Sequence, residues 1–415
     1  MEHKDIDHLF RHHSGKMVSV LTRIFGLSHL DIIEDAVQDT FIKASILWRK
    51  QQPEYPEAWL TKAAKNRVLD IFRTLKTQKT HIANLSTGTD AIAINELFLD
   101  KEIEDAQLRM IFTACHPKLD ARDRISFALK TVSGFSTKEI ASALLTKEET
   151  IKKRLVRARK SIQKAGLQFS IPQGKALKER LDSVMEVLYI IFNEGFHSNK
   201  KNQLIREDLC GEAMRLCQML LKNKTTRTSS SYALFALMCF HSARLPAKIN
   251  LNNEVIDLKQ QDRSLWHLPL IQLGNTMMNK AVETEDFSSY HYEAAIAAEH
   301  LKAKTYADTN WNKILNWYEK LYTMQPMPSH LLTIAVICIQ TKDYKKAESY
   351  FNKLEPKALE QRKYLFYAAK ADYYKAIHNL ELAIEHIHQA IEYVTNDLEK
   401  DYLLKKKSAW LNQLN

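Results

Sequence analysis

Glycine and proline are both scarce in this chain. Each contributes nine of the 415 residues, which is about 2% against the roughly 7% and 5% that are usual in proteins. Tight turns between β-strands consume glycine, so its scarcity favours helices over sheets. We therefore expect an all-α protein.

The usual signals of export, membrane insertion and metal binding are also missing. The N-terminus, MEHKDIDHLF, lacks the charged and then apolar segments of a signal peptide. The apolar run at 331–339 is too short to span a membrane. The five cysteines are scattered, without the close pairs of a zinc site. We expect a cytoplasmic protein with reduced thiols, no membrane partner and no metal or other cofactor.

What the chain does have is length, apolar side chains and positive charge. With 45% hydrophobic residues it can bury real cores, and 415 residues predict two or three domains. The net charge of +11 and the pI of about 9.1 indicate a polyanionic partner. Charge alone does not distinguish DNA from RNA or from an anionic membrane.

The sequence pattern divides the chain into four stretches. Residues 1–75 are expected to form a compact helical unit, and the polar residues 76–104 a flexible linker. Residues 105–168 form a second helical unit, which ends in a basic stretch. A long helical array follows over 175–415.

Two helices are expected in the first unit. Apolar residues recur at helical spacing between Leu30 and Trp48, and two prolines in 49–57 end that helix. A second helix then runs from Ala58 to about Leu75. The apolar positions at helical spacing in the first helix are Ile33, Val37, Phe41, Ala44, Leu47 and Trp48.

The second unit ends in a helix-turn-helix pattern over 135–163. Ser136 with Glu139 fits a capping box that starts a short helix, and Thr146 with Glu149 fits a cap of the next helix. Leu145 stands in the turn, where glycine is usual, so the turn must avoid a positive φ or carry strain.

The second helix of this pattern has one apolar face and many cations on its other faces. In helix-turn-helix proteins this helix enters the major groove of DNA, where long cations reach phosphates and guanine edges. A solvated basic helix in an ordinary bundle would show the same pattern. The apolar positions are Ile151, Leu155, Ala158 and Ile162, and the cations are Lys152, Lys153, Arg154, Arg157, Arg159, Lys160 and Lys164.

The end of the chain shows an internal repeat. Residues 343–354 are similar to residues 379–391, and Ala347 and Ala383 lie 36 residues apart, as do Phe351 and Ile387. This spacing is close to the 34-residue period of tetratricopeptide repeats. Generic helical packing would give a similar pattern.

Two short sequences invite an enzymatic hypothesis. Cys115 beside His116 suggests a nucleophile or a metal ligand, although neighbouring side chains usually point apart. Glu194 with His197 suggests acid–base chemistry, but a helix end capped by Gly195 explains that sequence more simply. No nucleotide-binding loop or zinc-protease motif occurs. We expect a protein without catalytic residues.

Two further motifs carry a resemblance to a known family. IEDAVQDTFIKA at 33–44, followed by AWLTKAAKNRVLDIFR at 58–73, resembles region 2 of the extracytoplasmic-function group of sigma-70 factors. The helix-turn-helix resembles region 4 of the same group. Two motifs in this order and spacing are much more specific than either motif alone.

The resemblance implies a role for each motif. One stripe of the first motif, formed by Asp35, Gln38 and Asp39, would dock on the clamp helices of core RNA polymerase. Region 4 would contact the polymerase flap. The second motif and the loop before it would bind the melted single strand of the −10 element through Trp48, Arg49, Lys50, Tyr55, Lys62, Lys65, Asn66 and Arg73. Duplex DNA of the −35 element would be read by Lys152, Lys153, Val156, Arg157 and Arg159. Trp59 is either a further stacking residue or part of the core.

The resemblance continues beyond region 4, through motifs such as VLYIIFNEGF at 187–196 and QDRSLWHLPLIQLGNTMMNKA at 261–281. It points to a subgroup with a long, tetratricopeptide-like C-terminal extension, which implies a regulatory domain in place of a separate anti-sigma protein. This domain would either gate access of the two DNA-binding domains or bind a regulatory protein as its signal. The chain is thus expected to be an alternative sigma factor. A repressor with a helical sensor domain would explain 105–168 and the extension, but not the block at 33–73.

Overall fold

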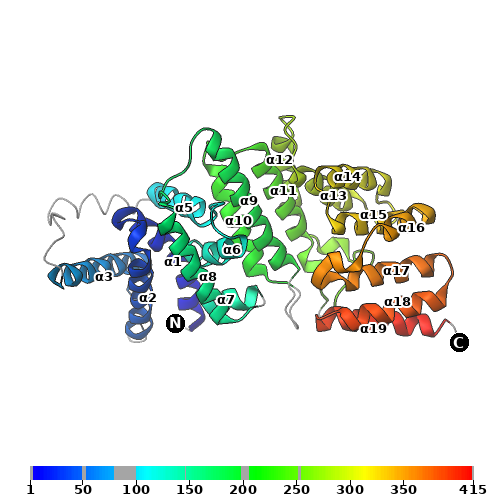
Figure 1. Cartoon of the computed structure of the whole chain (residues 1–415), viewed down its shortest axis with the longest axis horizontal. Coiled ribbons are helices and arrows are strands. Elements are labelled where there is room, and N and C mark those ends of the chain that lie inside the picture. The colour runs from blue at the N-terminus through cyan, green and yellow to red at the C-terminus, as the bar shows by residue number, and fades with distance from the viewer. Residues whose placement is uncertain are drawn as a thin grey trace. The chain divides into compact units, whose positions relative to one another are not determined.

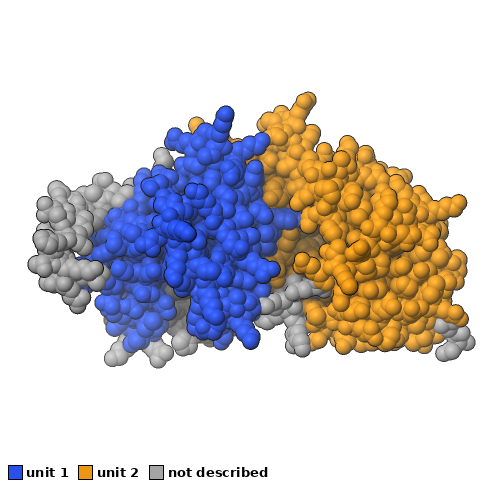
Figure 2. Space-filling model, viewed as in Figure 1, with its two compact units in different colours: residues 1–191 blue, residues 192–415 orange. Residues whose placement is uncertain are grey.

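The computed structural model describes residues 3–48, 53–78, 100–144, 146–197, 205–250 and 254–413. Helices account for the regular structure of these segments, which contain no β-strand; an isolated bridge joins Ile249 to Val255. The expectation of an all-α protein is confirmed (Figure 1). The chain divides into two compact units, Met1–Ile191 and Phe192–Asn415 (Figure 2).

Unit 1 begins with three helices that pack on one another. They are α1 (His3–Phe25), α2 (Leu30–Leu47) and α3 (Pro56–Gln78), with a short 3-10 turn, η1 (Leu27–His29), after α1. Leu21, Ile33 and Leu60 are each fully buried, one from each helix. Of the apolar positions at helical spacing in α2, Leu47 is not part of the core, because it is 54% exposed.

The rest of unit 1 contains the helix-turn-helix. Its helices are α5 (Asp100–Ala114), α6 (Ala121–Thr131), α7 (Thr137–Ala143), α8 (Glu148–Lys164) and most of α9 (Lys175–Phe196). The predicted capping box of α7 is confirmed: Ser136 Oγ accepts from the Glu139 amide, and the Glu139 carboxylate accepts from the Ser136 amide. Of the predicted linker 76–104, residues 79–99 lie outside the described residues, as does Leu145 in the turn.

The predicted cap of α8 is wrong. Lys147 occupies the N-cap position and its side chain makes no capping hydrogen bond. The helix therefore starts one residue later than the pattern of Thr146 with Glu149 requires. Glu148, in the first turn, instead accepts a hydrogen bond from the Thr137 hydroxyl of α7 at 2.9 Å. This contact joins the two helices across the turn.

A glycine allows α1 to lie directly against the end of α6. A Cβ atom at Gly15 would lie 1.9 Å from the carbonyl oxygen of Val132, far closer than any side chain tolerates. The two backbones are therefore in contact. Farther along α1, Arg23 pairs with Glu102 at 2.5 Å and with Asp105 at 3.2 Å, both on α5.

The first half of α9 packs on the helix-turn-helix unit. Ser183 Oγ donates to the carbonyl of Cys115 at 2.6 Å, and Arg180 donates to that of Phe112 at 2.6 Å. These bonds satisfy two carbonyls at the C-terminal end of α5, which have no partner within their own helix.

Unit 2 is an array of antiparallel helices. α11 is its most deeply buried helix, with Ala233 to Phe240 all buried, and it packs on α10, α12 and α13. The helices are α10 (Glu207–Lys222), α11 (Ser229–Ala243), α12 (Leu268–Ala281), α13 (Ser289–Lys302), α14 (Trp311–Met324), α15 (Pro328–Gln340), α16 (Tyr344–Asn352), α17 (Tyr364–Ala376), α18 (Leu380–Tyr393) and α19 (Asp397–Leu411), with 3-10 turns η2 (Leu245–Ala247), η3 (Arg263–Leu265) and η4 (Pro356–Arg362).

Gly195 has a different role from the one predicted. It lies inside the last turn of α9 and does not adopt a positive φ, so it is not a left-handed cap. A Cβ atom there would lie 2.8 Å from the Arg206 carbonyl and from the Cys210 amide. Glycine is required because the start of α10 passes so close.

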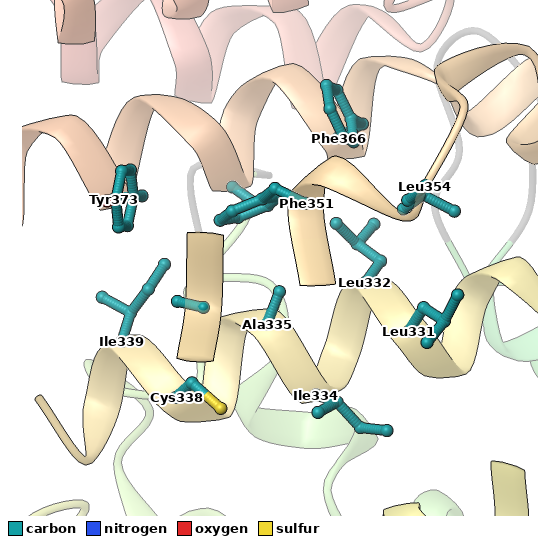
Figure 3. Packing of buried hydrophobic residues seen from close by; sticks show 12 residues of the cluster. Leu331, Leu332, Ile334, Ala335, Cys338, Ile339, Phe351, Leu354, Phe366 and Tyr373 are labelled. Atoms are coloured by element: carbon teal, nitrogen blue, oxygen red, sulfur yellow. The ribbon is translucent and has the colours of Figure 1, made fainter. Parts of the chain in front are cut away.

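The internal repeat corresponds to two successive helix pairs, α15 with α16 and α17 with α18. The equivalent residues Ala347 and Ala383 are both fully buried. Asp343 and Asn379, also 36 residues apart, each cap the second helix of a pair through a hydrogen bond to a backbone amide. Figure 3 shows the core of the first pair, in which Ala335, Phe351 and Phe366 come from α15, α16 and α17.

The connecting turns repeat as well. Lys342 and His378 each precede the capping residue of the following helix, and each has a positive φ, of 60° and 62° respectively. Both therefore adopt the left-handed conformation that usually selects glycine. The 36-residue period is thus present in the backbone as well as in the side chains.

Candidate polymerase and promoter interface

An acidic and polar stripe lies on the exposed face of α2. Asp35 and Gln38 are exposed and Asp39 is partly exposed, so the three predicted docking residues share one helical face. Burial, with repulsion from Asp31 and Asp39, raises the pKa of Asp35. Arg67 of α3 donates to Asp39 at 2.9 Å and holds its carboxylate in place.

The same stripe continues into apolar side chains that the sequence analysis did not single out. Ile42 is 51% exposed and Ile46 is 61% exposed, and they follow Asp39 at helical spacing. Neither residue belongs to the apolar set that recurs at helical spacing along α2. An apolar residue outside that set is the sequence signal that could have identified them. Exposed aliphatic side chains beside carboxylates are typical of a protein-binding surface.

A basic groove of about 580 Å³ runs between α1 and α3. The predicted −10 residues Lys62, Lys65 and Asn66 all line it, together with Lys16 of α1, which was not predicted. Glu57 at its edge pairs with His13 at 2.9 Å. Amines and an amide along one groove are suited to bind a nucleic-acid backbone.

The other predicted −10 residues are dispersed. Tyr55 is 69% exposed just before α3. Trp48 is only 5% exposed and packs edge-on against Trp59, with the ring centroids 5.5 Å apart; a base could stack on it only if it left this position. Arg73 pairs with Asp70 at 3.2 Å. Arg49 and Lys50 lie outside the described residues.

The predicted −35 residues on α8 face different surroundings. Lys152, Lys153 and Val156 are exposed, although Lys152 also pairs with Glu149 of its own helix at 3.1 Å. The Arg157 guanidinium makes two hydrogen bonds, of 3.1 and 2.7 Å, to Asp123 of α6. The Asp123 side chain is only 5% exposed, so Arg157 provides the charge that a buried carboxylate requires.

Arg159 points toward α2 and contacts its acidic residues. It pairs with Asp31 at 2.5 Å and forms a second ion pair with Glu34. Burial alone would lower the pKa of Arg159, but the two carboxylates raise it. Burial raises the pKa of Glu34, against the attraction of Arg159. Arg159 is therefore not presented on the same surface as Lys153 and Val156.

Burial shifts the ionisation of both Cys115 and His116. Cys115 is buried, which raises the pKa of its thiol to about 12 and keeps it protonated at neutral pH. Burial and nearby cations lower the pKa of His116 to about 4. No group of three or more His, Cys, Asp or Glu side chains in the described segments is placed to hold a metal ion. Among those same segments, no helix has the length and apolar character to cross a membrane.

Three family models match successive parts of the chain. The model of sigma-70 region 2 matches residues 9–78, that of sigma-70 region 4 matches residues 109–162, and a family of unknown function matches residues 180–282. The first two matches cover the basic groove, the α2 stripe and the helix-turn-helix. The third begins within α9 and ends after α12.

Two relatives extend this comparison. An uncharacterized protein of Rhizobium meliloti is 32% identical over 313 residues, which cover 74% of both chains. The ECF RNA polymerase sigma factor SigE of Mycolicibacterium smegmatis is 26% identical over 157 residues, which cover 38% of this chain and 60% of that protein. No solved structure matches the chain. Together with the order of the two sigma regions, these matches show that the chain belongs to the sigma-70 family, as a transcription initiation factor of the extracytoplasmic-function type with a C-terminal extension.

Proposed function

We propose that this sigma factor docks on the clamp helices of core RNA polymerase through the stripe of α2. The observation that carries the proposal is the continuity of Asp35, Gln38 and Asp39 with the exposed Ile42 and Ile46. Carboxylates attract a basic partner surface, and aliphatic side chains beside them gain free energy when a partner covers them.

In this proposal two other surfaces bind promoter DNA. Lys153 and Val156, with Lys152, read duplex DNA of the −35 element, because their side chains are exposed on α8. The groove lined by Lys62 and Lys65 holds the backbone of the melted −10 strand. Tyr55, at the entrance to α3, is the exposed aromatic residue available to stack on a base.

Docking and the Arg159 contact use the same helix. Asp31 and Glu34, which hold Arg159, lie within one helical turn of Asp35. We infer that α8 leaves α2 when the polymerase clamp binds. The contact is then a feature of the free factor, and the polymerase must compensate for its loss.

The C-terminal extension is proposed to be a regulatory domain that binds a protein signal. Its support is the regular array of helix pairs and a groove of about 1080 Å³ in unit 2, lined by residues of α17 and α19 among others. The aromatic side chains Tyr306, Tyr402 and Trp410 lie along this groove, and aromatic residues are enriched at protein interfaces.

Size-exclusion chromatography of the full-length protein with bacterial core polymerase tests the docking proposal. The double change Asp35→Ala with Asp39→Ala should abolish co-elution, because it removes both carboxylates of the stripe. The matched control is Glu283→Ala with Glu285→Ala, which removes two exposed carboxylates in unit 2. Equal loss of co-elution in both double variants would refute the proposed docking face. If the wild-type protein did not bind core polymerase but bound duplex promoter DNA on its own, this result would indicate a repressor.

A further inference from the structure

Buried nitrogen atoms without a hydrogen-bond partner gather around Trp266 in unit 2. Within the described part of this unit, six buried side-chain polar atoms lack a partner, and five of them belong to one cluster. A native core leaves few such atoms, and each one calls for a ligand, a water molecule or another explanation. The five atoms are His241 Nδ1, Arg244 Nε, Arg263 Nη2, Trp266 Nε1 and His300 Nδ1.

The cluster is assembled from three elements. His241 and Arg244 lie at the C-terminal end of α11, Arg263 and Trp266 lie in and just after η3, and His300 lies in the last turn of α13. The Trp266 side chain is 8% exposed. The Cζ atoms of Arg263 and Arg244 lie 4.5 and 5.9 Å from the centroid of its ring.

Arg244 and Arg263 are partly exposed, and neither has the paired carboxylate that Arg206 and Arg215 of the same unit possess. Arg206 pairs with Asp208 at 2.9 Å and Arg215 pairs with Glu212 at 2.8 Å. Arg244 and Arg263 form no ion pair within the described residues. The undescribed segments of unit 2 are 198–204, 251–253 and 414–415, and none of them contains an Asp or Glu. The buried nitrogen atoms of these two guanidinium groups lose their hydration, which is costly without a hydrogen-bond partner.

One guanidinium nitrogen of Arg263, Nη1, has an evident structural role. It donates to the carbonyls of His300 and Ala303, both at 2.7 Å, and so caps the end of α13. Arg244 has no comparable partner: its hydrogen bond to the described residues is a 3.5 Å contact from Nη2 to Gln261 Oε1. Hydrogen bonds to the described residues therefore give no structural reason for a guanidinium group at Arg244.

The charge nearest Arg244 is also positive, whereas at Arg263 burial lowers the pKa and the nearby carboxylate of Asp308 acts against that effect. Burial, and then the neighbouring Arg263, lowers the pKa of Arg244 to about 10, so its guanidinium stays charged at neutral pH. Burial, and then the neighbouring Arg244 and Lys248, lowers the pKa of His241 to about 3. His300, with a pKa lowered to about 4, is likewise neutral at pH 7. Each neutral imidazole can donate one hydrogen bond.

We propose that Arg244, Arg263, Trp266, His241 and His300 bind a small dianion of the phosphate class. Guanidinium and indole groups donate hydrogen bonds and accept none, so the missing partner must supply acceptor oxygens. Two guanidinium groups match the charge of a dianion, and arginine pairs with phosphate through two parallel hydrogen bonds. A metal cation would be repelled, and a monocarboxylate would supply half the charge. Inorganic phosphate and a small phosphomonoester share the required chemistry.

Thermal unfolding of the full-length protein in phosphate-free buffer tests the site. Inorganic phosphate, sodium acetate and sodium chloride are titrated separately at constant ionic strength, and unfolding is followed by circular dichroism. Above its Kd, phosphate should raise Tm with the logarithm of its concentration, by roughly 5 °C at 100 times the Kd. Acetate and chloride should not. A titration with glycerol 3-phosphate then distinguishes the sources, since an ester that binds more tightly than phosphate identifies a phosphorylated metabolite as the ligand.

Arg244→Met and Arg215→Met form a matched pair of variants. Arg244→Met removes an unpaired cation, so it should raise Tm in the absence of phosphate and abolish the phosphate-dependent shift. Arg215→Met breaks a paired arginine, so it should lower Tm and retain the shift. If Arg244 is structural instead, Arg244→Met lowers Tm and phosphate still protects, which overturns the proposal.

A second variant keeps the test decisive if Arg244→Met does not fold. Trp266→Phe preserves the ring and removes only the N–H donor, and it should raise the Kd for phosphate about tenfold or more. An unchanged Kd in this variant would overturn the proposal. So would equal shifts of Tm by phosphate and chloride in the wild-type protein.

Discussion

Arg159 of α8 forms an ion pair with Glu34 of α2, which joins the helix-turn-helix to the helix that carries the acidic stripe. Glu34 is adjacent in sequence to Asp35, and its side chain is only 9% exposed in this arrangement. The contact of Gly15 with Val132 lies in the same unit and also joins sigma region 2 to region 4. In the free factor the two regions are therefore held together by specific contacts.

Replacing Arg159 with alanine should strengthen binding of the full-length factor to core polymerase by several-fold. The change removes the ion pairs between α8 and α2 and leaves the acidic and polar stripe of α2 unaltered. Lys160→Ala is the control, because Lys160 is an exposed cation at the next position of the same helix. Fluorescence anisotropy of labelled factor gives both affinities. Weaker binding of the Arg159 variant than of the Lys160 variant would contradict the proposed opening of α8 from α2.

Glu34→Gln should stabilise the protein at pH 7 and flatten its dependence on pH. Burial raises the pKa of Glu34 above its unfolded value, so the folded state binds the proton more tightly. The ionised carboxylate then lowers the free energy of unfolding at neutral pH. This loss is recovered as pH falls through the folded pKa toward the ordinary pKa of a glutamic acid. Urea unfolding at pH 7 and pH 5 should show a smaller gain at the lower pH. A variant that is less stable than wild type at both values would show that the Arg159 pair outweighs burial.

Gly15→Ala should destabilise unit 1 by about 1–3 kcal/mol, although alanine favours a helix. The added Cβ would overlap the backbone of Val132, which cannot rotate away as a side chain could. Gly211→Ala in α10 is the matched control, because a Cβ there meets no atom within 4 Å. That change should stabilise by roughly 0.5–1 kcal/mol. Chemical unfolding monitored by circular dichroism measures both, and two changes of the same sign would count against the close contact.

Lys153→Ala and Arg157→Ala should differ in their effect on stability. Both are expected to weaken binding to a −35 duplex in the holoenzyme. Only Arg157→Ala should also lower Tm, because it leaves the buried carboxylate of Asp123 without its partner. Mobility-shift titration and thermal unfolding separate the two effects. If Lys153→Ala left −35 binding unchanged, the assignment of this face of α8 to DNA would fail.

Lys342→Gly and His378→Gly should each stabilise unit 2 by about 0.5–1 kcal/mol. Both positions have a positive φ, which glycine adopts without the steric cost of a Cβ atom. Alanine at either position keeps that cost and should give no gain. Urea unfolding of the four single variants measures this difference, and a loss of stability with glycine would indicate that the side chains make contacts that matter more.

The sequence predicted well what depends on nearby residues. The apolar face of α8 was correct at Ile151, Leu155, Ala158 and Ile162, because helical periodicity places those side chains on one side of the helix. The capping box of α7 and the spacing of Ala347 and Ala383 were correct for the same local reason.

The sequence could not predict what depends on distant contacts. Arg159 and Lys160 are equivalent cations in any helical pattern, and only the position of α2 decides which of them is paired. Leu47 is exposed although it stands at helical spacing, because the buried face of α2 runs from Ala44 to Trp48 and leaves Leu47 outside it. The surroundings of Trp266 depend on α11 and α13, which are distant in sequence from η3.

The 36-residue period of the C-terminal array bears on how such a chain can change its length. A tandem copy of residues 343–378 would begin at a capping Asp and end at a left-handed turn residue, so each junction would match a junction that already exists. Insertion or deletion of a whole copy keeps every buried alanine in phase, whereas any other length of insertion shifts the apolar face of the next helix. The extension can therefore gain or lose helix pairs by gene duplication without altering the residues that bind DNA.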